Sequence, residues 1–307
     1  MAPRFCVLGS INMDLVARVD RFPRPGETRA GSGFGTYPGG KGANQAVALA
    51  RLGADVRMAG KIGDDVFGAE YSETFRREGI GTGEIEVVAN TSTGVAMIEV
   101  NDEGENNIVI VAGANGLVDR AYVDAHLAAL AEAGIALFQL ETPFDTVCHA
   151  MAKLREHGTT TILDPAPAPP DGLSRDMLGS ATYVTPNERE AETLTGVAVS
   201  DAHSAASAGA RLREQGAQSV IIKAGAAGAY IVDEAGTRQV AGFAVETVDT
   251  TAAGDAFNAG LAFALGSDRA IDEAVRFANA VGALACTGVG AQSALPSSTA
   301  AEDLLHG

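Results

Sequence analysis

Strand-like and helix-like patterns alternate along most of the chain, and this alternation restricts the possible fold more than any other feature. From residue 56 onward, short apolar runs are followed by amphipathic helical stretches, in units of roughly 30 residues. Such units join parallel strands through crossover helices that cover both faces of a sheet. The pattern predicts a single doubly wound α/β domain over residues 1–307, with a mainly parallel sheet flanked by helices. No internal repeat or change in composition divides the chain.

Two pairs of extended segments interrupt the alternation and predict a second, small sheet. Residues 15–37 alternate in polarity and are broken by prolines and glycines, and residues 94–100 and 107–111 form a hairpin pattern around a polar turn. We expect a small β-sheet lid formed by inserted segments, about 13–38 and 92–113. Two surface hairpins without a lid role are the alternative.

Composition and charge exclude several classes of partner. The chain is 46% hydrophobic and 20% charged, as in ordinary globular enzymes, and its formal net charge is −17. So strong a negative charge argues against nucleic acid and against an acidic membrane surface. No apolar run reaches the ~20 residues of a membrane helix. The three cysteines lie in apolar surroundings without metal-ligand spacing, which indicates free thiols in a reducing compartment, and we expect a cytoplasmic protein.

Several helix starts are marked by capping residues. Asp65 and Asp119 precede amphipathic stretches, and Thr142 followed by Pro143 is typical of an N-cap and a first helical residue. A further helix begins after Gly40.

The stretch from Asp249 to Gly260 combines small residues with an acid at the start of a helix. Residues 244–248 form an extended run and residues 256–265 an apolar helical stretch, so we expect a strand that leads into a helix. The backbone N–H groups of this junction are open to a ligand, and a helix N-terminus favours an anion.

Asp255 lies beside this predicted anion site, where a carboxylate would repel a phosphate. It would be useful there if it took a proton from a hydroxyl that attacks the phosphate. Capping of the helix is an equally good interpretation of the residue alone.

Polar side chains also follow the first strand and begin a helix nearby. Asn12 and Asp14 come after the apolar run at residues 4–8, at the edge of an α/β sheet where ligands bind. An Asx turn is the alternative for this pair. Lys41 and Asn44 lie in the first turn of a helix, where a lysine opposes the macrodipole, although a lone lysine is more often an exposed surface residue.

Two long motifs resemble the signatures of the ribokinase-like carbohydrate kinases, the phosphofructokinase-B superfamily. They are Gly-Gly-Lys-Gly-Ala-Asn-Gln-Ala at residues 39–46, continuing to Gly53, and Asp-Thr-Thr-Ala-Ala-Gly-Asp-Ala-Phe-Asn-Ala-Gly at residues 249–260. Their order and separation also fit, and the resemblance extends over essentially the whole chain. A phosphate loop of the Gly-Lys-Ser/Thr type is absent from the sequence.

The resemblance implies a role for each matching residue. The sugar would be held by Asn12, Asp14, Gly40, Lys41, Asn44, Glu141 and Asp255. Asp255 would be the catalytic base, and the anion hole would be formed by Ala252, Ala253 and Gly254. The nucleotide would be bound by Asn187, Lys223, Gly225, Gly228 and Asn279.

The resemblance also implies metal ions. Glu190 would act near Mg²⁺, although from the residues alone 187–190 is a helix start with ordinary acidic residues. A monovalent cation, K⁺, would be bound largely by carbonyl oxygens at Asp249, Thr251, Ala285, Gly288 and Gly290. The chain departs from close relatives at Gly288 and Val289, where they have basic residues, and at Ala294, where they have serine.

Taken together, the resemblance implies ATP-dependent phosphorylation of ribose at its 5-hydroxyl, with Mg²⁺ and with K⁺ as activator. Ribose and ATP would be the partners, and lid strands would pair in a homodimer. A sibling kinase for fructose, a deoxy sugar or a nucleoside is the alternative. A non-catalytic sugar or nucleotide sensor would be expected to lack Asp255, Lys41 or the small-residue loop, and all three are present.

Overall fold

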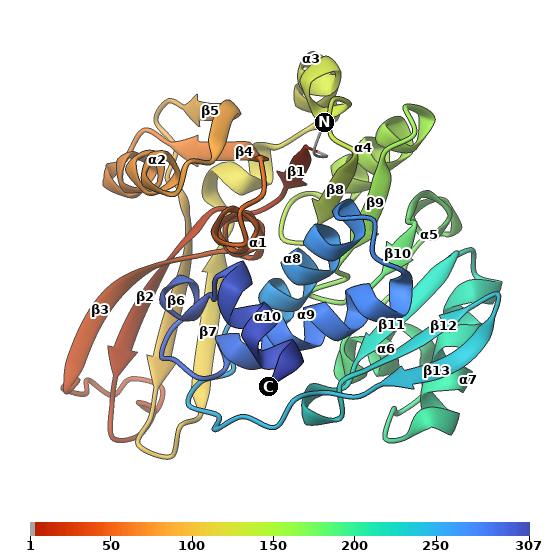
Figure 1. Ribbon diagram of the computed structural model, residues 1–307. Helices are drawn as coiled ribbons and strands as arrows, with labels where there is room; N and C mark the ends of the chain where they lie inside the picture. Colours follow the sequence, from red (N-terminus) through yellow and green to blue (C-terminus); the bar gives the residue numbers. More distant parts are fainter. Residues whose placement is uncertain (1–3) are drawn as a thin grey trace.

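A mainly parallel sheet forms the centre of this computed structural model, which describes residues 4–307 (Figure 1). In the described residues the sheet has nine strands, parallel except at the two pairs β11/β12 and β12/β13. Their spatial order is β13 (Gly236–Val240), β12 (Ala229–Asp233), β11 (Ser219–Lys223), β10 (Tyr183–Val184), β9 (Thr160–Leu163), β8 (Ile135–Phe138), β1 (Phe5–Leu8), β4 (Val56–Gly63) and β5 (Gly81–Val88).

Helices cover both faces of this sheet, and each face has its own apolar core. One core includes Tyr71, Phe75 and Phe277 and is covered by α1 (Lys41–Arg51), α2 (Val66–Glu78), α8 (Ala253–Gly266), α9 (Ile271–Ala285) and α10 (Ser298–His306). The other is covered by α3 (Arg120–Leu130), α4 (Phe144–Glu156), α5 (Arg175–Ser180), α6 (Glu188–Thr195) and α7 (Ala202–Glu214). The predicted doubly wound α/β fold is confirmed.

A second sheet projects beside the large one (Figure 1). Its order is β3 (Gly33–Gly39), β2 (Asn12–Arg18), β6 (Gly94–Val100) and β7 (Asn106–Val111), with β2 and β6 parallel and the outer pairs antiparallel. The hairpin predicted around residues 101–105 is therefore present as β6 and β7. Every residue of β7 is exposed, so apolar side chains on both faces of this edge strand meet solvent.

Cap residues explain where several helices begin. Asp65 and Asp119 accept hydrogen bonds from the first turns of α2 and α3, as predicted. The predicted cap at Thr142 is wrong, because Pro143 has an extended ψ of 124° and α4 begins only at Phe144. The hydroxyl of Thr142 is buried and has no hydrogen-bond partner among the described residues.

The strand predicted at residues 244–248 is also wrong. The segment between β13 and α8 has no strand structure, and its Val248 N–H donates to the carbonyl of Cys286, at 2.8 Å, in the loop after α9. A strand needs the open edge of a neighbouring strand, whereas this segment forms a wall of the cavity described below.

Across residues 4–307, every helix is too short or too polar to cross a membrane.

Candidate active site

The predicted site residues come together at one edge of the large sheet, where its parallel strands end. Asn12 follows β1, Glu141 follows β8, Asp164 follows β9, and Lys223 is the last residue of β11. The carboxyl ends of parallel strands share an edge, which brings together side chains that are far apart in sequence. The N-terminal turns of α1 and α8 complete the site.

Glu141 is the centre of the sugar-binding residues that the sequence predicts. Its Oε2 atom accepts hydrogen bonds from Asn12 Nδ2 (3.4 Å), from the Lys41 backbone N–H (3.3 Å) and from the Ser10 hydroxyl. Asn115 donates to Asn12 Oδ1 at 2.7 Å and thereby fixes which end of the Asn12 amide faces Glu141. Asn12 therefore lies in β2 with its side chain in a network, and not in an Asx turn.

Glycines allow the backbone to come close to these side chains. Gly40 has φ +84°, and a Cβ there would lie 2.6 Å from the backbone nitrogen of Asn12. A Cβ on Gly39 would lie 2.2 Å from Asp14 Oδ2. Tyr71, which is buried, donates its hydroxyl to the carbonyl oxygens of Asn12 and Gly39 and ties β2 to β3.

Asp255 is almost completely buried, with 4% of its surface exposed. Its Oδ2 accepts a hydrogen bond from Asn44 Nδ2 at 3.0 Å, and its Oδ1 accepts one from Gln45 Nε2 at 3.1 Å. The N-cap of α8 is Ala252, with no side-chain capping bond. The capping interpretation of Asp255 is therefore not what the structure contains.

The α8 N-terminus lies beside this carboxylate. Ala252 has a left-handed φ of 60°, and the first intrahelical bond runs from the Ala256 N–H to its carbonyl, at 2.8 Å. The N–H group of Ala253 donates to the Thr250 carbonyl at 3.2 Å. The Ala253 N–H of the predicted anion hole is therefore already hydrogen bonded within the protein. The Gly254 N–H lies in the first turn of α8, before the first bond between helix residues four apart.

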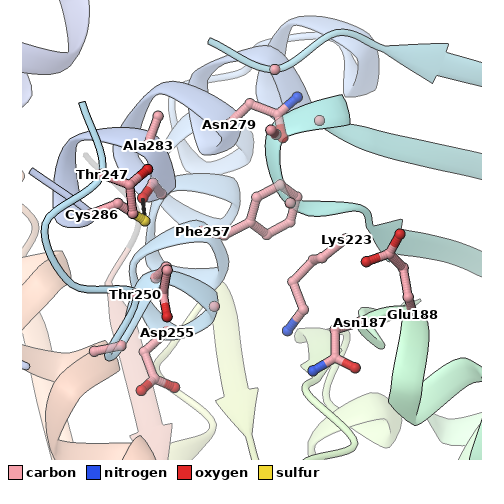
Figure 2. A pocket seen from close by; sticks show the side chains of 18 of the residues that line it. Asn187, Glu188, Lys223, Thr247, Thr250, Asp255, Phe257, Asn279, Ala283 and Cys286 are labelled. Carbon is pink, nitrogen blue, oxygen red and sulfur yellow. Dashed lines mark hydrogen bonds between the residues drawn. The ribbon is translucent and has the colours of Figure 1, made fainter. Parts of the chain in front are cut away.

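A cavity of about 740 Å³ extends from Asp255 between α8, α9 and the loops after β9, β10 and β11 (Figure 2). Lys41, Glu190 and the α8 N-terminus line this cavity. So do all the residues predicted to bind a nucleotide, which are Asn187, Lys223, Gly225, Gly228 and Asn279. In Figure 2, Lys223 and Asn187 lie on the opposite side of the view from Thr247 and Cys286.

Two of these lining residues also have structural roles. Gly228 has φ +93°, and a Cβ there would lie 2.1 Å from the carbonyl oxygen of Val240. The Asn279 amide donates to the carbonyl oxygens of Val240 (3.0 Å) and Ala241 (3.2 Å), and holds the segment after β13 against α9. Both residues therefore maintain the wall of the cavity.

Where the predicted sugar-binding residues meet the cavity, the charged side chains shift one another's pKa values. Burial lowers the pKa of Lys41, but surrounding carboxylates outweigh burial and raise it above its ordinary value; they are Asp255, Asp164, Glu141 and Glu190. Burial raises the pKa of Asp14 to about 7, with further contributions from the carboxylates of Glu141 and Asp255. Burial likewise raises the pKa of Asp255, opposed by the charge of Lys41.

Asn187 and Glu190 form the capping box of α6. Asn187 Oδ1 accepts from the Glu190 N–H, and Glu190 Oε2 accepts from the Asn187 N–H, each at 2.8 Å. Both residues line the cavity, so the residues that cap α6 are also placed for the predicted nucleotide contact.

Residues 4–307 hold no group of three or more His, Cys, Asp or Glu side chains that could bind a metal ion. Mg²⁺ is commonly held by one or two carboxylates with substrate phosphates and water, and Glu190 on the cavity wall fits that mode.

The segments predicted to surround a monovalent cation lie next to each other. Asp249 Oδ1 accepts from the Thr251 N–H at 2.9 Å, and Asp249 Oδ2 accepts from the Gly290 N–H at 2.9 Å. Burial alone would raise the pKa of Asp249, but hydrogen bonds from the Thr251 hydroxyl and from the Gly290 and Thr251 N–H groups outweigh it and hold the pKa below its ordinary value. The carboxylate thus connects residues 249–251 with the loop of Gly288 and Gly290, while Ala285 is buried at the end of α9.

Four polar residues of the site were not predicted from the sequence: Ser10, Gln45, Asn115 and Asp164. Asp164 Oδ1 accepts from Lys223 Nζ at 2.8 Å, and its Oδ2 accepts from Gln45 Nε2 at 3.2 Å. Asp164 directly follows an apolar strand, the same signal that identified Asn12 and Glu141, so this rule would have found it.

Comparisons with known proteins identify the family of this chain. The model of the pfkB family carbohydrate kinases matches residues 2–298. Ribokinase of Haemophilus influenzae is 43% identical over 296 residues, covering 96% of each chain, and ribokinase of Bacillus subtilis is 42% identical, covering 98% of each. The structure of Arabidopsis thaliana ribokinase complexed with ribose and ATP superposes with a TM-score of 0.94, at 31% identity and 99% coverage of both chains. The chain belongs to the pfkB family of carbohydrate kinases.

Proposed function

We propose that this protein is an ATP-dependent kinase that phosphorylates D-ribose at the 5-hydroxyl, giving ribose 5-phosphate and ADP. Family membership and the similarity to ribokinases support a sugar as the acceptor. One observation carries the assignment. Asp255, a buried carboxylate, accepts a hydrogen bond from Asn44, a predicted sugar-binding residue, and it also lines the cavity predicted to bind the nucleotide. It thus stands where an acceptor hydroxyl and a terminal phosphate would meet.

The sugar side of the site would bind a polyol through paired acceptors and donors. Carboxylates of Asp14 and Glu141 accept hydrogen bonds from hydroxyls, while the amides of Asn12 and Asn44 and the ammonium of Lys41 donate them. This set holds the 5-hydroxyl toward Asp255, so positioning supplies part of the rate acceleration.

The chemical step is a displacement at phosphorus. The 5-hydroxyl oxygen forms a bond to the γ-phosphorus as the bond from that phosphorus to the β,γ-bridging oxygen breaks, and ADP leaves with those electrons. Asp255 takes the hydroxyl proton, a role that typically contributes ~10²–10⁴-fold.

The anion hole would stabilise charge on the transferring phosphoryl group. The first-turn N–H of Gly254 points along the α8 axis, where the macrodipole favours an anion, and Ala252 and Ala253 shape the approach. Lys41 and Lys223 bring positive side-chain charge to the same cavity. Such fixed dipoles and charges would act strongly once the bound substrates exclude water from the site.

Glu190 would hold Mg²⁺ that arrives with ATP, next to the nucleotide contacts of Asn187. When bound, the ion neutralises charge on the β- and γ-phosphates. Asn187, Lys223, Gly225, Gly228 and Asn279 would surround the nucleotide itself.

We also propose a K⁺ site formed by carbonyl oxygens of the two segments that Asp249 connects. The candidates are the carbonyls of Asp249, Thr251, Ala285, Gly288 and Gly290. Ala294 supplies no hydroxyl, and carbonyl ligation does not require one. Because residues 249–251 lead directly into α8, an ion there would stabilise the anion hole.

The small sheet supports a homodimer in which lid strands of two subunits pair or pack. Phe34, Met97, Ile108, Val109 and Ile110 are each at least half exposed, an unusual density of apolar surface for one small sheet. Pairing would also cover the open edge of β7.

The three cysteines are free thiols in the structure, which supports our expectation of a reducing, cytoplasmic location.

The test is ADP release from Mg²⁺-ATP with ribose, 2-deoxyribose, fructose, adenosine and pseudouridine, each in K⁺ and in Na⁺, with the product identified by mass and NMR. We expect ribose-selective turnover and phosphate on C5. Turnover on another acceptor would assign the protein as a sibling kinase. A folded protein that binds ribose but releases no ADP would instead be a sensor.

A further inference from the structure

Gln45 lies between two buried carboxylates that belong to different parts of the site. It is on the second turn of α1 and has no exposed surface. Its Nε2 donates to Asp255 Oδ1 at 3.1 Å and to Asp164 Oδ2 at 3.2 Å. Each hydrogen of the amide NH₂ group therefore has a carboxylate partner.

The partners at both ends of this amide agree on its orientation. Gln45 Oε1 accepts from Gln139 Nε2 at 2.7 Å, at the end of β8. A flipped amide would place its oxygen against the carboxylates of Asp255 and Asp164 and its NH₂ against another NH₂. Electrostatics thus exclude the flip.

The hydrogen bonds connect the base to the nucleotide cavity. Asp164 Oδ1 is paired with Lys223 Nζ at 2.8 Å, so Lys223, Asp164, Gln45 and Asp255 form one chain of contacts. The second oxygen of Asp255 is bound to Asn44. Adjacent residues of α1 thereby hold both oxygens of the base.

We propose that Gln45 is a positioning residue for phosphoryl transfer: its amide NH₂ separates the carboxylates of Asp255 and Asp164, fixes the orientation of the base and keeps the base ionised. This inference rests on the proposed function, in which Asp255 accepts a proton. A base that has already taken a proton from solvent cannot accept one from the sugar.

The surrounding charges explain why the base needs this donor. Asp255 faces the positive Lys41 from α1, and the carboxylates of Asp164 and Asp14 from the loop after β9 and from β2. Burial and the carboxylate of Asp164 raise the pKa of Asp255, whereas Lys41 and the hydrogen bonds from Asn44 and Gln45 lower it. Without Gln45, the carboxylates of Asp255 and Asp164 would repel each other with no donor between them, and this repulsion would raise the pKa of Asp255 further.

The decisive experiment is the pH dependence of kcat at saturating ribose and ATP, for the wild-type protein and for Gln45→Met. Saturation keeps the titration of Asp14 in the free enzyme out of the profile. Methionine has a similar length but donates no hydrogen bond. We expect the acidic limb of the profile to move upward by about one pH unit or more, with kcat at high pH within roughly tenfold of wild type.

Two further variants distinguish this role from a structural one. Adding Asp164→Asn to Gln45→Met removes the opposing charge, and it is expected to return the acidic limb toward wild type. Gln139→Met is the control, because it removes an amide of the same network that touches neither carboxylate. The acidic limb of its pH profile should stay within about 0.3 pH unit of wild type.

An unmoved limb in Gln45→Met would overturn the inference, as would a shift that Asp164→Asn does not reverse. Should Gln45→Met fail to fold, Gln45→Leu removes the same hydrogen-bond donor with a smaller apolar side chain. The acidic limb of its profile must then move upward as well, and an unchanged limb refutes the role. If the wild-type protein does not phosphorylate ribose, the proposed function fails separately, and the same profiles are measured on the acceptor that turns over.

Discussion

Gly40 combines a restricted backbone conformation with close contacts in the sugar site, which makes Gly40→Ala an informative perturbation. Its φ of +84° is rarely adopted by alanine, and the added Cβ would lie 2.6 Å from the nitrogen of Asn12 and 3.0 Å from the carbonyl oxygen of Ser10. Both contacts are backbone atoms, which cannot rotate away. The substitution must therefore move the chain at Asn12 or at the start of α1.

Gly53 provides a matched control at the other end of the same helix. Its φ is +94°, but a Cβ there would meet no atom within 4 Å. Gly53→Ala should thus cost only the left-handed backbone, roughly 1–2 kcal/mol. Gly40→Ala adds the overlap with fixed backbone, for which overpacked cores give roughly 1–3 kcal/mol more.

The assays are urea unfolding and steady-state kinetics with ribose. We expect Gly40→Ala to lower the free energy of unfolding by about 2–5 kcal/mol, from those two terms together. A displacement of about 1 Å in a positioned site can cost ~10²-fold, so kcat/KM for ribose should fall by at least tenfold, while Gly53→Ala keeps wild-type kinetics. Equal stability of the two variants, with ribose kinetics unaffected in both, would refute the account of Gly40.

Three other outcomes follow from the structure. Asp14 has a folded-state pKa raised to about 7 from 3.8, so its contribution to stability is full below pH 3.8 and is lost as pH rises from there to about 7, while its ionisation near pH 7 should lower the KM for ribose. Asp14→Asn should flatten that KM profile, and a flat profile in the wild type would contradict the assignment. Val109→Lys on exposed β7 should give a monomer by light scattering, whereas the equally exposed Val87→Lys on β5 should not; a dimer in both variants would place the interface elsewhere. ADP release should be faster in K⁺ than in Na⁺, and Asp249→Ala should remove the difference; equal rates of the wild type in the two salts would count against the cation site.

The sequence was sufficient for the features that depend on local pattern. Capped, amphipathic stretches gave α2 and α3, and apolar runs gave the buried parallel strands. Placing Asn12 and Glu141 at one sheet edge needed only the rule that parallel strands end together. The two motifs then identified the α1 and α8 N-termini as the ligand side.

What the sequence missed depends on contacts between distant segments. Gln45 follows Asn44 on a buried helix, and nothing local distinguishes it from a core residue until β8 and β9 bring Gln139 and Asp164 against it. The run at residues 244–248 has the polarity of a strand, but in the described residues it bonds to the carbonyl of Cys286 and lines the cavity instead of pairing with a strand. Both cases were decided by tertiary packing, which overrides local propensity.

The most direct test of the central claim is Asp255→Asn, assayed for turnover and for binding in parallel. Asparagine keeps the shape of the side chain but cannot take the proton of the 5-hydroxyl. We predict a loss of ~10²–10⁴-fold in kcat for ribose, with ribose and ATP affinities by calorimetry within a few fold of wild type. Turnover near that of the wild-type protein would contradict the assignment of Asp255 as the base.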